Sequence, residues 1–203
     1  MNIFVTGTDT DVGKTVVSSW LCVHTTAKYW KPIQTGDDSD KNTVKKLSPP
    51  TEIISEAYRL KAPLSPYDSA KSENIEINLE LFDEITSREK SLCIIEGAGG
   101  VLVPIAENFF MADLIKRCGA KAIVVAKSKL GMINHTLMTV EILRARKIDV
   151  IGTVINGEID SGIKDTLEKF SRVKIFGIIP HSENLYETLR NVKLSPEFLE
   201  MIS

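Results

Sequence analysis

The sequence has 203 residues, of which 43% are hydrophobic and 26% are charged, and its formal net charge is −2. This length fits one domain with a sizeable core, spanning residues 1–203. The near-balanced charge gives no reason to expect binding to nucleic acid or to an anionic membrane through bulk electrostatics. No apolar run approaches the roughly 20 residues of a membrane span. With no basic leader after Met1 and no C-x-x-C pair among three cysteines, we expect a cytoplasmic protein with buried, reduced thiols.

Short apolar runs rich in β-branched residues alternate along the chain with amphipathic stretches of helical length. Because these runs are continuously apolar, both faces of their sheet should be covered, as in a parallel sheet between helices. The order predicts an α/β fold, doubly wound, with a mostly parallel sheet and helices on both faces. In chain order we expect strands at 3–6, 92–96, 122–126, 150–155 and 175–179, and helices at 15–26, 109–118, 132–146 and 161–170.

One region, residues 35–78, departs from this alternation. It is polar, contains four prolines and shows no sustained period. We predict loops over the face of the sheet, with a helix at residues 40–47. Long loops of this kind are often functional, although surface decoration explains the pattern equally well.

The first strand leads into T-G-T-D-T-D-V-G-K-T, residues 6–15, which ends like a phosphate-binding loop. The general pattern G-x-x-x-x-G-K-[ST] requires glycine at position 8, where this chain has Thr8. In such a loop, backbone N–H groups and a helix N-terminus face phosphate, Lys14 reaches the outer phosphates and the Thr15 hydroxyl binds Mg²⁺. The alternative is a chance G-K-T at a helix start, with Thr15 serving only as a cap.

The strand at 92–96 ends in an acid, Glu96, and Gly97, Gly99 and Gly100 follow closely. An acid at the carboxyl end of a central strand occupies the Walker B position, where it faces the nucleotide and its Mg²⁺. The glycines let the backbone approach a ligand closely. A tight turn with a solvated Glu96 is the alternative, and the phosphate loop upstream favours the site.

Lys31 stands before Pro32, which favours an extended conformation for the lysine. A strand that ends at Lys31 would place its ammonium at the same edge of the sheet. Asp38 and Asp40 follow as candidate oxygen ligands. The alternative is a surface lysine on an edge strand.

Asn156 and Pro180 each follow a late strand, where α/β nucleotide sites place their contacts to the base. An ordinary turn residue is the alternative for Asn156. The chain has no N-K-x-D guanine motif, so the identity of the base stays open. The three histidines share no metal-ligand spacing, and none is assigned to catalysis.

Taken together, these stretches resemble the dethiobiotin synthetase family of the P-loop NTPase superfamily. The matching segments follow one another along the whole chain, at residues 6–15, 31–36, 96–100 and 129–135. The resemblance implies an ATP-dependent cyclo-ligase of biotin biosynthesis that uses Mg²⁺. Such an enzyme joins CO₂ to 7,8-diaminopelargonate (7,8-diaminononanoate) through a carbamate and a carbamic-phosphoric mixed anhydride. Its products are dethiobiotin, ADP and phosphate.

The resemblance also implies roles for individual residues. Lys31 and Lys14 are the implied catalytic residues. Thr15, Glu96 and Asp40 are the implied metal ligands, with Asp38 as the alternative to Asp40. The implied nucleotide contacts are Asp11, Val12, Gly13, Lys14, Thr15, Val16, Asp40, Glu96, Gly97, Ala98, Gly99, Asn156, Gly157, Pro180, His181, Ser182 and Glu183. The implied substrate contacts are Thr10, Asp11, Thr35, Gly131 and Asn134.

Two of these contact groups have a particular meaning under the resemblance. The turn from Gly131 to Asn134 resembles the helix start that binds the substrate carboxylate across a homodimer interface. Carboxylates beside a polyanion are otherwise unfavourable, but in a loop that also faces a diamine, Asp11 and the Thr10 hydroxyl can accept hydrogen bonds from amines. A solvent-facing carboxylate is the alternative for Asp11.

Three other kinds of protein share parts of this pattern. A ParA/MinD-like switch ATPase typically carries a second lysine near the loop start, where this chain has Thr8 and Asp9. The tail also has mixed charges and Pro196, unlike the basic membrane helix of MinD-type members. A cobyrinate-type amidotransferase synthetase needs a partner glutaminase with a cysteine nucleophile, and no cysteine here has a suitable setting. A small-molecule kinase would need an arginine-rich lid, which the sequence does not show.

Overall fold

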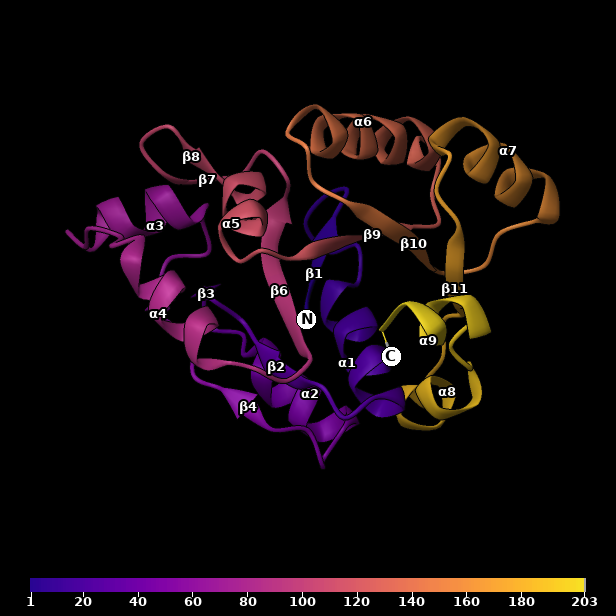
Figure 1. Cartoon of the computed structure of the whole chain (residues 1–203), viewed down its shortest axis with the longest axis horizontal. Coiled ribbons are helices and arrows are strands. Elements are labelled where there is room, and N and C mark those ends of the chain that lie inside the picture. The colour runs from indigo at the N-terminus through magenta and orange to yellow at the C-terminus, as the bar shows by residue number, and fades with distance from the viewer. Residues whose placement is uncertain (203) are drawn as a thin grey trace.

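A seven-stranded sheet in which every neighbouring pair is parallel organises the computed structural model, which describes residues 1–202 (Figure 1). Its strand order is β11-β10-β9-β1-β6-β2-β4. β3 pairs with β5 in a separate parallel ribbon, and β7 pairs with β8 in an antiparallel one. The strands are β1 (Asn2–Gly7), β2 (Lys28–Trp30), β3 (Ile33–Thr35), β4 (Ile53–Ile54), β5 (Tyr58–Leu60), β6 (Cys93–Gly100), β7 (Pro104–Ala106), β8 (Phe109–Phe110), β9 (Lys121–Lys127), β10 (Val150–Asn156) and β11 (Ile175–Ile179).

Helices cover both faces of this sheet. Successive residues of β1 point to opposite sides: Phe4 joins the core beneath α4, α5 and α6, whereas Ile3 and Val5 join the core beneath α1, α2, α8 and α9. The predicted doubly wound, mostly parallel α/β fold is therefore confirmed. The helices are α1 (Lys14–His24), α2 (Asp40–Leu47), α3 (Pro66–Ser72), α4 (Glu80–Arg88), α5 (Met111–Arg117), α6 (Met132–Ala145), α7 (Ser161–Ser171), α8 (Leu185–Asn191) and α9 (Pro196–Ile202).

The long elements lie where the sequence predicts them, with shifted ends. α1 ends at His24, two residues before the predicted end, because Thr25 is already extended. The helix expected at 109–118 begins only at Met111, since Phe109 and Phe110 pair with β7 and the Phe110 N–H donates to the Asp113 side chain. β6 continues to Gly100 and does not stop at Glu96.

The prediction for residues 35–78 is right in one part and wrong in another. The helix at 40–47 is α2, with the predicted bounds. The remainder is not only loop: β4 extends the main sheet, β5 pairs with β3, and α3 packs near them. Strands of two or three residues are too short to show a period in the sequence, which explains the miss.

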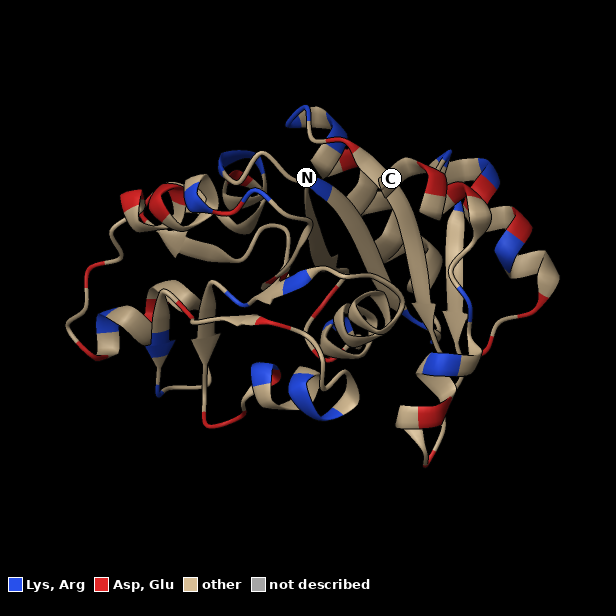
Figure 2. Cartoon of the chain, turned by 60° about the horizontal axis from the view of Figure 1, so that its bottom comes forward, with Lys and Arg blue, Asp and Glu red and all other residues tan. Residues whose placement is uncertain are grey.

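The interior and the surface differ in the expected way. Cys22, Cys93 and Cys118 are all buried and free, as predicted, and burial raises the pKa of each thiol to about 12. Acidic and basic positions are interspersed along the outer helices (Figure 2). No helix within residues 1–202 combines the length and the hydropathy that crossing a membrane requires.

Candidate active site

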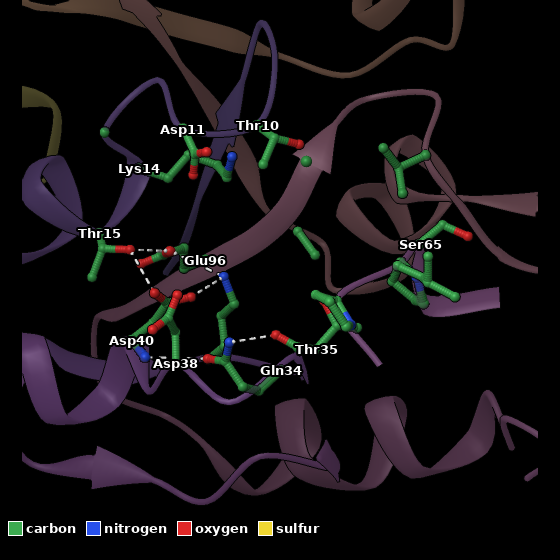
Figure 3. A pocket seen from close by; sticks show the side chains of 18 of the residues that line it. Thr10, Asp11, Lys14, Thr15, Gln34, Thr35, Asp38, Asp40, Ser65 and Glu96 are labelled. Atoms are coloured by element: carbon green, nitrogen blue, oxygen red, sulfur yellow. Dashed lines mark hydrogen bonds and ion pairs between the residues drawn. The ribbon is translucent and has the colours of Figure 1, made fainter. Parts of the chain in front are cut away.

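A cavity of about 830 Å³ opens where the loops after β1, β2 and β6 meet (Figure 3). These three strands lie next to one another in the sheet, in the order β1-β6-β2. The carboxyl edge of a parallel sheet is where α/β folds place their ligands. The cavity is lined by Thr10, Asp11, Gly13, Lys14, Thr15, Val16, Lys31, Gln34, Thr35, Asp38, Asp40, Pro63, Leu64, Ser65, Pro66, Glu96, Ala98, Gly99 and Val103.

The loop between β1 and α1 is held in shape by backbone geometry and by one amide side chain. Gly13, at the N-cap of α1, has a left-handed conformation with φ of 98°. A Cβ there would fall 2.1 Å from Nδ2 of Asn156, whose amide donates to the Val12 carbonyl at 3.1 Å. Position 13 therefore needs glycine for both its conformation and its contact. The Lys14 ammonium folds back and donates to the Asp9 carbonyl at 3.0 Å.

The aspartates of this loop face different surroundings. Asp11 lines the cavity, whereas the Asp9 carboxylate lies 3.8 Å from the Lys129 ammonium and accepts from the Thr10 N–H. Asp9 is thus paired with a cation outside the cavity, so its charge is partly offset before any phosphate arrives. Of these two aspartates, only Asp11 lines the cavity.

Thr15, Asp40 and Glu96 meet at the base of the cavity, on three different elements (Figure 3). The Thr15 hydroxyl lies 3.0 Å from Oδ1 of Asp40 and 2.8 Å from Oε1 of Glu96. Asp38 lines the same cavity, but its side chain does not reach this meeting point in the contacts of the described chain. The geometry favours Asp40 over Asp38 as the aspartate of the group.

Lys31 joins both carboxylates. Its ammonium lies 2.6 Å from Asp40 and 3.1 Å from Glu96, and it also donates to the Gly97 carbonyl at 3.0 Å. The placement follows from strand pairing: Trp30 is level with Ile95, so one further residue on each parallel strand brings Lys31 beside Glu96. Lys31 is 4% exposed, which excludes the alternative of a surface lysine.

The charges in this group support one another. Burial opposes the charge of Lys31, yet Glu96 and Asp40 raise its pKa above the ordinary value. Burial likewise opposes the charge of Asp40, but Lys31 holds the pKa of that carboxyl below its usual range. Burial and then the charge of Lys31 lower the pKa of Lys14 to about 8. An arriving anion would favour protonated Lys14, so this part of the cavity is suited to a polyphosphate.

The same group fits a magnesium ion carried by a nucleotide. Hydroxyl and carboxylate oxygens are the hard ligands that Mg²⁺ prefers. Within residues 1–202 no three His, Cys, Asp or Glu side chains are placed to hold a metal by themselves. Mg²⁺ commonly binds one or two carboxylates and takes its other ligands from phosphates and water. Thr15, Asp40 and Glu96 match that pattern.

The glycines after Glu96 serve two different purposes. Gly99 lines the cavity, as does the neighbouring Ala98. Gly97 does not: a Cβ there would lie 2.8 Å from the Phe4 ring and 3.3 Å from the Met111 sulfur. Core packing against β6 is therefore a sufficient reason for glycine at position 97, and the contact of its backbone with a ligand stays a prediction.

The remaining predicted residues lie outside this cavity. The Val12 side chain is fully buried in the core, so a nucleotide could meet only its backbone. Asn156 contacts the phosphate loop, and a Cβ on Gly157 would lie 3.3 Å from His181. The positions that do not line the cavity are Val12, Gly97, Asn156, Gly157, Pro180, His181, Ser182, Glu183, Gly131 and Asn134.

Comparison with known proteins identifies the family. A family model described as an AAA domain matches residues 1–188. A dethiobiotin synthetase of Paramagnetospirillum magneticum is 47% identical, over 87% of this chain and 86% of the relative. One of Lawsonia intracellularis is 41% identical, over 99% of this chain and 98% of the relative. The chain belongs to the ATP-dependent dethiobiotin synthetase family.

Structural similarity alone would not have separated this family from its rivals. A ParA family ATPase of Chlorobium tepidum superposes with a TM-score of 0.56, covering 93% of this chain and 88% of its own, at 14% identity. At that identity the likeness shows the fold only. The motifs and the full-length relatives are what place the chain among the dethiobiotin synthetases and not among the switch ATPases.

Several residues at or near the cavity were not predicted from the sequence to belong to the site of this synthetase. The Tyr29 hydroxyl donates to Oε2 of Glu96 at 2.9 Å, Oε1 of Gln34 accepts from the Asp40 N–H at 3.2 Å, and Ser65 lines the wall opposite the phosphate loop. Only Tyr29 had a usable signal. It stands two residues before Lys31, and alternate residues of a strand share one face.

Proposed function

We propose that this chain forms dethiobiotin from 7,8-diaminopelargonate, CO₂ and ATP, with release of ADP and phosphate. Its membership in the family of ATP-dependent dethiobiotin synthetases, at 41% identity over 99% of its length, is the main support. The observation in the site that carries the proposal is Lys31, a buried ammonium between Glu96 and Asp40. Hydrolysis of a nucleotide by water does not require a second lysine of this kind, whereas a carbamate anion does.

The proposed reaction has three bond-forming steps. One amine nitrogen of the substrate attacks CO₂ and loses a proton, which gives a carbamate. A carbamate oxygen then attacks the γ-phosphorus of ATP, and ADP leaves. The second amine attacks the carbonyl carbon of the mixed anhydride and loses a proton, and phosphate leaves as the cyclic urea closes.

The second step brings two anions together, and the residues of the cavity supply the opposing charge. Lys14 extends from the phosphate loop, and Lys31 extends from the end of β2. Fixed cations near developing negative charge stabilise such transition states strongly, because no solvent must reorganise. We propose that Lys14 binds the outer phosphates and that Lys31 binds the carbamate as it attacks.

We further propose that Thr15, Asp40 and Glu96 hold Mg²⁺ together with the phosphates. When bound, Mg²⁺ would neutralise charge on the transferred phosphoryl group. The Lys31 ammonium now lies within 3.1 Å of both carboxylates. Lys31 can therefore bind the carbamate only if Asp40 and Glu96 turn toward Mg²⁺. In this way, binding of the nucleotide with its metal ion would free Lys31 from its two ion pairs.

The other predicted contacts extend the proposed site in two directions. Thr10, Asp11 and Thr35 line the cavity and offer oxygen acceptors to the amines of the substrate. We propose that Asn156, Gly157 and residues 180–183 contact the base. His181, Ser182 and Glu183 are exposed and follow β11, beside the loop that holds Gly157.

A homodimer would complete the substrate site. Gly131, with φ of 90°, is the N-cap of α6, and the neighbouring Leu130 is fully exposed. Met138, one helical turn past Asn134, is also exposed, at 57%. We propose that this helix start meets a second copy of the chain and that Gly131 and Asn134 bind the substrate carboxylate there. Cytoplasmic location stays a prediction.

The decisive test is an assay that depends on the diamine. The purified chain, with diaminopelargonate, labelled bicarbonate, Mg²⁺ and ATP, should form labelled dethiobiotin and ADP in equal amounts, measured by mass spectrometry. Omission of the diamine should leave only slow ATP hydrolysis. ATP hydrolysis that is equally fast with and without the diamine, and without dethiobiotin, would contradict the proposal and favour a switch ATPase.

A further inference from the structure

The hydroxyl of Tyr29 makes a contact that the proposed reaction does not use. Tyr29 lies on β2 and is fully buried. Its hydroxyl donates to Oε2 of Glu96 at 2.9 Å. Its ring lies in the core beneath α1 and α2. The contact thus joins the hydrophobic core directly to a predicted metal ligand.

Strand geometry explains why Tyr29 reaches this carboxylate. Tyr29 and Lys31 are two residues apart, so both point to the same face of the sheet. Tyr29 is level with Ile94 on the adjacent strand β6, and Glu96 lies two residues beyond Ile94 on that same face. Tyr29 on β2 and Lys31 just after it therefore both reach Glu96.

The hydrogen bonds divide the two carboxylate oxygens of Glu96. Oε2 accepts from Tyr29, whereas Oε1 faces both the Thr15 hydroxyl at 2.8 Å and the Lys31 ammonium at 3.1 Å. Two oxygens held on opposite sides fix the plane of the carboxylate. With Glu96 only 1% exposed, water is poorly placed to take over the task of Tyr29.

Tyr29 is also a dependable donor. Burial, and then the negative charge of Glu96, raise the pKa of its phenol well above the ordinary value. The phenol is therefore the donor of this hydrogen bond.

We propose that Tyr29 is a positioning residue that orients Glu96 for the metal ion of the nucleotide complex. By holding Oε2, the hydroxyl aims Oε1 at Thr15 and at the cavity. This inference rests on the proposed function only in assuming that a metal-nucleotide complex binds at the phosphate loop. Partners of this kind, one bond removed from the metal, commonly change metal affinity by about 10- to 100-fold.

The test is Tyr29→Phe, which keeps the ring in the core and removes only the hydroxyl. ADP binding is measured by calorimetry across a range of Mg²⁺ concentrations, from metal-free buffer upward. We expect the Mg²⁺ concentration at half-maximal enhancement of ADP binding to rise by about tenfold. Metal-free ADP affinity should stay unchanged, because Tyr29 does not line the cavity.

Tyr58→Phe is the matched control. It removes another phenol hydroxyl that makes a hydrogen bond, since the Tyr58 oxygen accepts from the Asn78 N–H at 2.8 Å. Tyr58 neither lines the cavity nor touches Glu96. Its Mg²⁺ dependence should match that of the wild type.

Two results would overturn the inference. An unchanged Mg²⁺ dependence in Tyr29→Phe would mean that the tyrosine only fills the core. An equal loss of metal-free and metal-dependent ADP binding, together with a lower melting temperature, would mean that the hydroxyl supports the fold as a whole.

The measurement is independent of the synthetase chemistry. ADP binding requires neither the diamine nor CO₂, so the inference can hold even if no dethiobiotin is formed. Conversely, dethiobiotin formation with an unaltered Mg²⁺ response in Tyr29→Phe would support the proposed function and overturn the role of Tyr29.

Discussion

Two regions of the predicted site are built in opposite ways. The inner cluster, defined as Lys14, Thr15, Lys31, Asp40 and Glu96, is linked by hydrogen bonds and ion pairs within the chain. The outer segments, residues 129–131 and 181–183, are exposed. A buried charge is costly without a partner, so the inner cluster must be paired before any ligand arrives. The outer segments carry no such requirement and can wait for a ligand or a second chain.

This difference suggests different roles for the two regions, with the reaction in the inner cluster and binding or assembly in the outer segments. Inner-cluster residues come from the ends of neighbouring strands and from two helix starts, so the sheet itself fixes their distances. Outer-segment residues depend on loops beyond the cavity. Substitutions in the inner cluster should therefore damage turnover, whereas those in the outer segments should affect binding or assembly. Substitutions of single residues test this division.

The largest effect is expected for Lys31→Ala. Loss of the ammonium removes the charge that would meet the carbamate, so turnover should fall at least about 1000-fold. Lys14 and the phosphate loop remain, so ATP should still bind. Dethiobiotin formation and nucleotide binding, measured on the same preparation, test both statements.

Lys28→Ala provides the control on the same strand. Lys28 forms ion pairs with Glu52 and Glu89 and does not line the cavity. Its activity should stay near that of the wild type. If Lys31→Ala keeps more than roughly a tenth of the activity, the lysine is structural and the charge argument for the inner cluster fails.

A smaller effect is expected for Asp40→Asn. The amide keeps the shape of the carboxylate but loses the charge that faces Lys31 at 2.6 Å. It also keeps only one oxygen, whereas the carboxylate presents one to Lys31 and one to Thr15. The requirement for Mg²⁺ should rise and turnover should fall about 100-fold. Activity measured across Mg²⁺ concentrations checks both changes.

Asp38→Asn is the matched control, because Asp38 lines the same cavity without contacting Thr15 or Lys31. We expect a change of no more than roughly threefold, typical of substitutions outside a packed network. A reversed order, with Asp38→Asn more damaging than Asp40→Asn, would identify Asp38 as the third ligand.

The inner cluster was also the part that could be predicted from sequence. The phosphate loop, the acid after an apolar strand and the lysine before proline each sit at the end of a strand. Parallel strands bring such ends to one edge, so strand order alone assembles Lys14, Lys31 and Glu96. The choice of Asp40 over Asp38 needed coordinates, because the two aspartates are only two residues apart at the start of α2.

What could not be predicted depended on neighbours far along the chain. The packing of Phe4 and Met111 against Gly97 could not be predicted, because both residues are distant in sequence. For Tyr29, the sequence indicates only a shared strand face with Lys31. Its contact with Glu96 could not be predicted, because that partner is 67 residues away. β4 and β5 have too few residues to display a period.

The smallest effect is expected in the outer segments, from Leu130→Asp. Leu130 is fully exposed beside the N-terminus of α6, where the homodimer is proposed to form. A charge there should oppose burial against a second copy and raise the dimer dissociation constant about tenfold. Sedimentation velocity over a range of protein concentrations measures that constant.

Phe170→Asp separates a specific interface from general surface hydrophobicity. Phe170 is exposed on α7, at 63%, and is not part of the proposed interface. This variant should dimerise like the wild type.

The KM for the diamine separates the two variants as well. It should be unchanged in Phe170→Asp, whose dimers are intact. Leu130→Asp should raise this KM without altering the contacts of the inner cluster. Two results would contradict this division. Either dimers survive Leu130→Asp, or the wild type stays monomeric while it makes dethiobiotin. Each would show that one chain completes its own site.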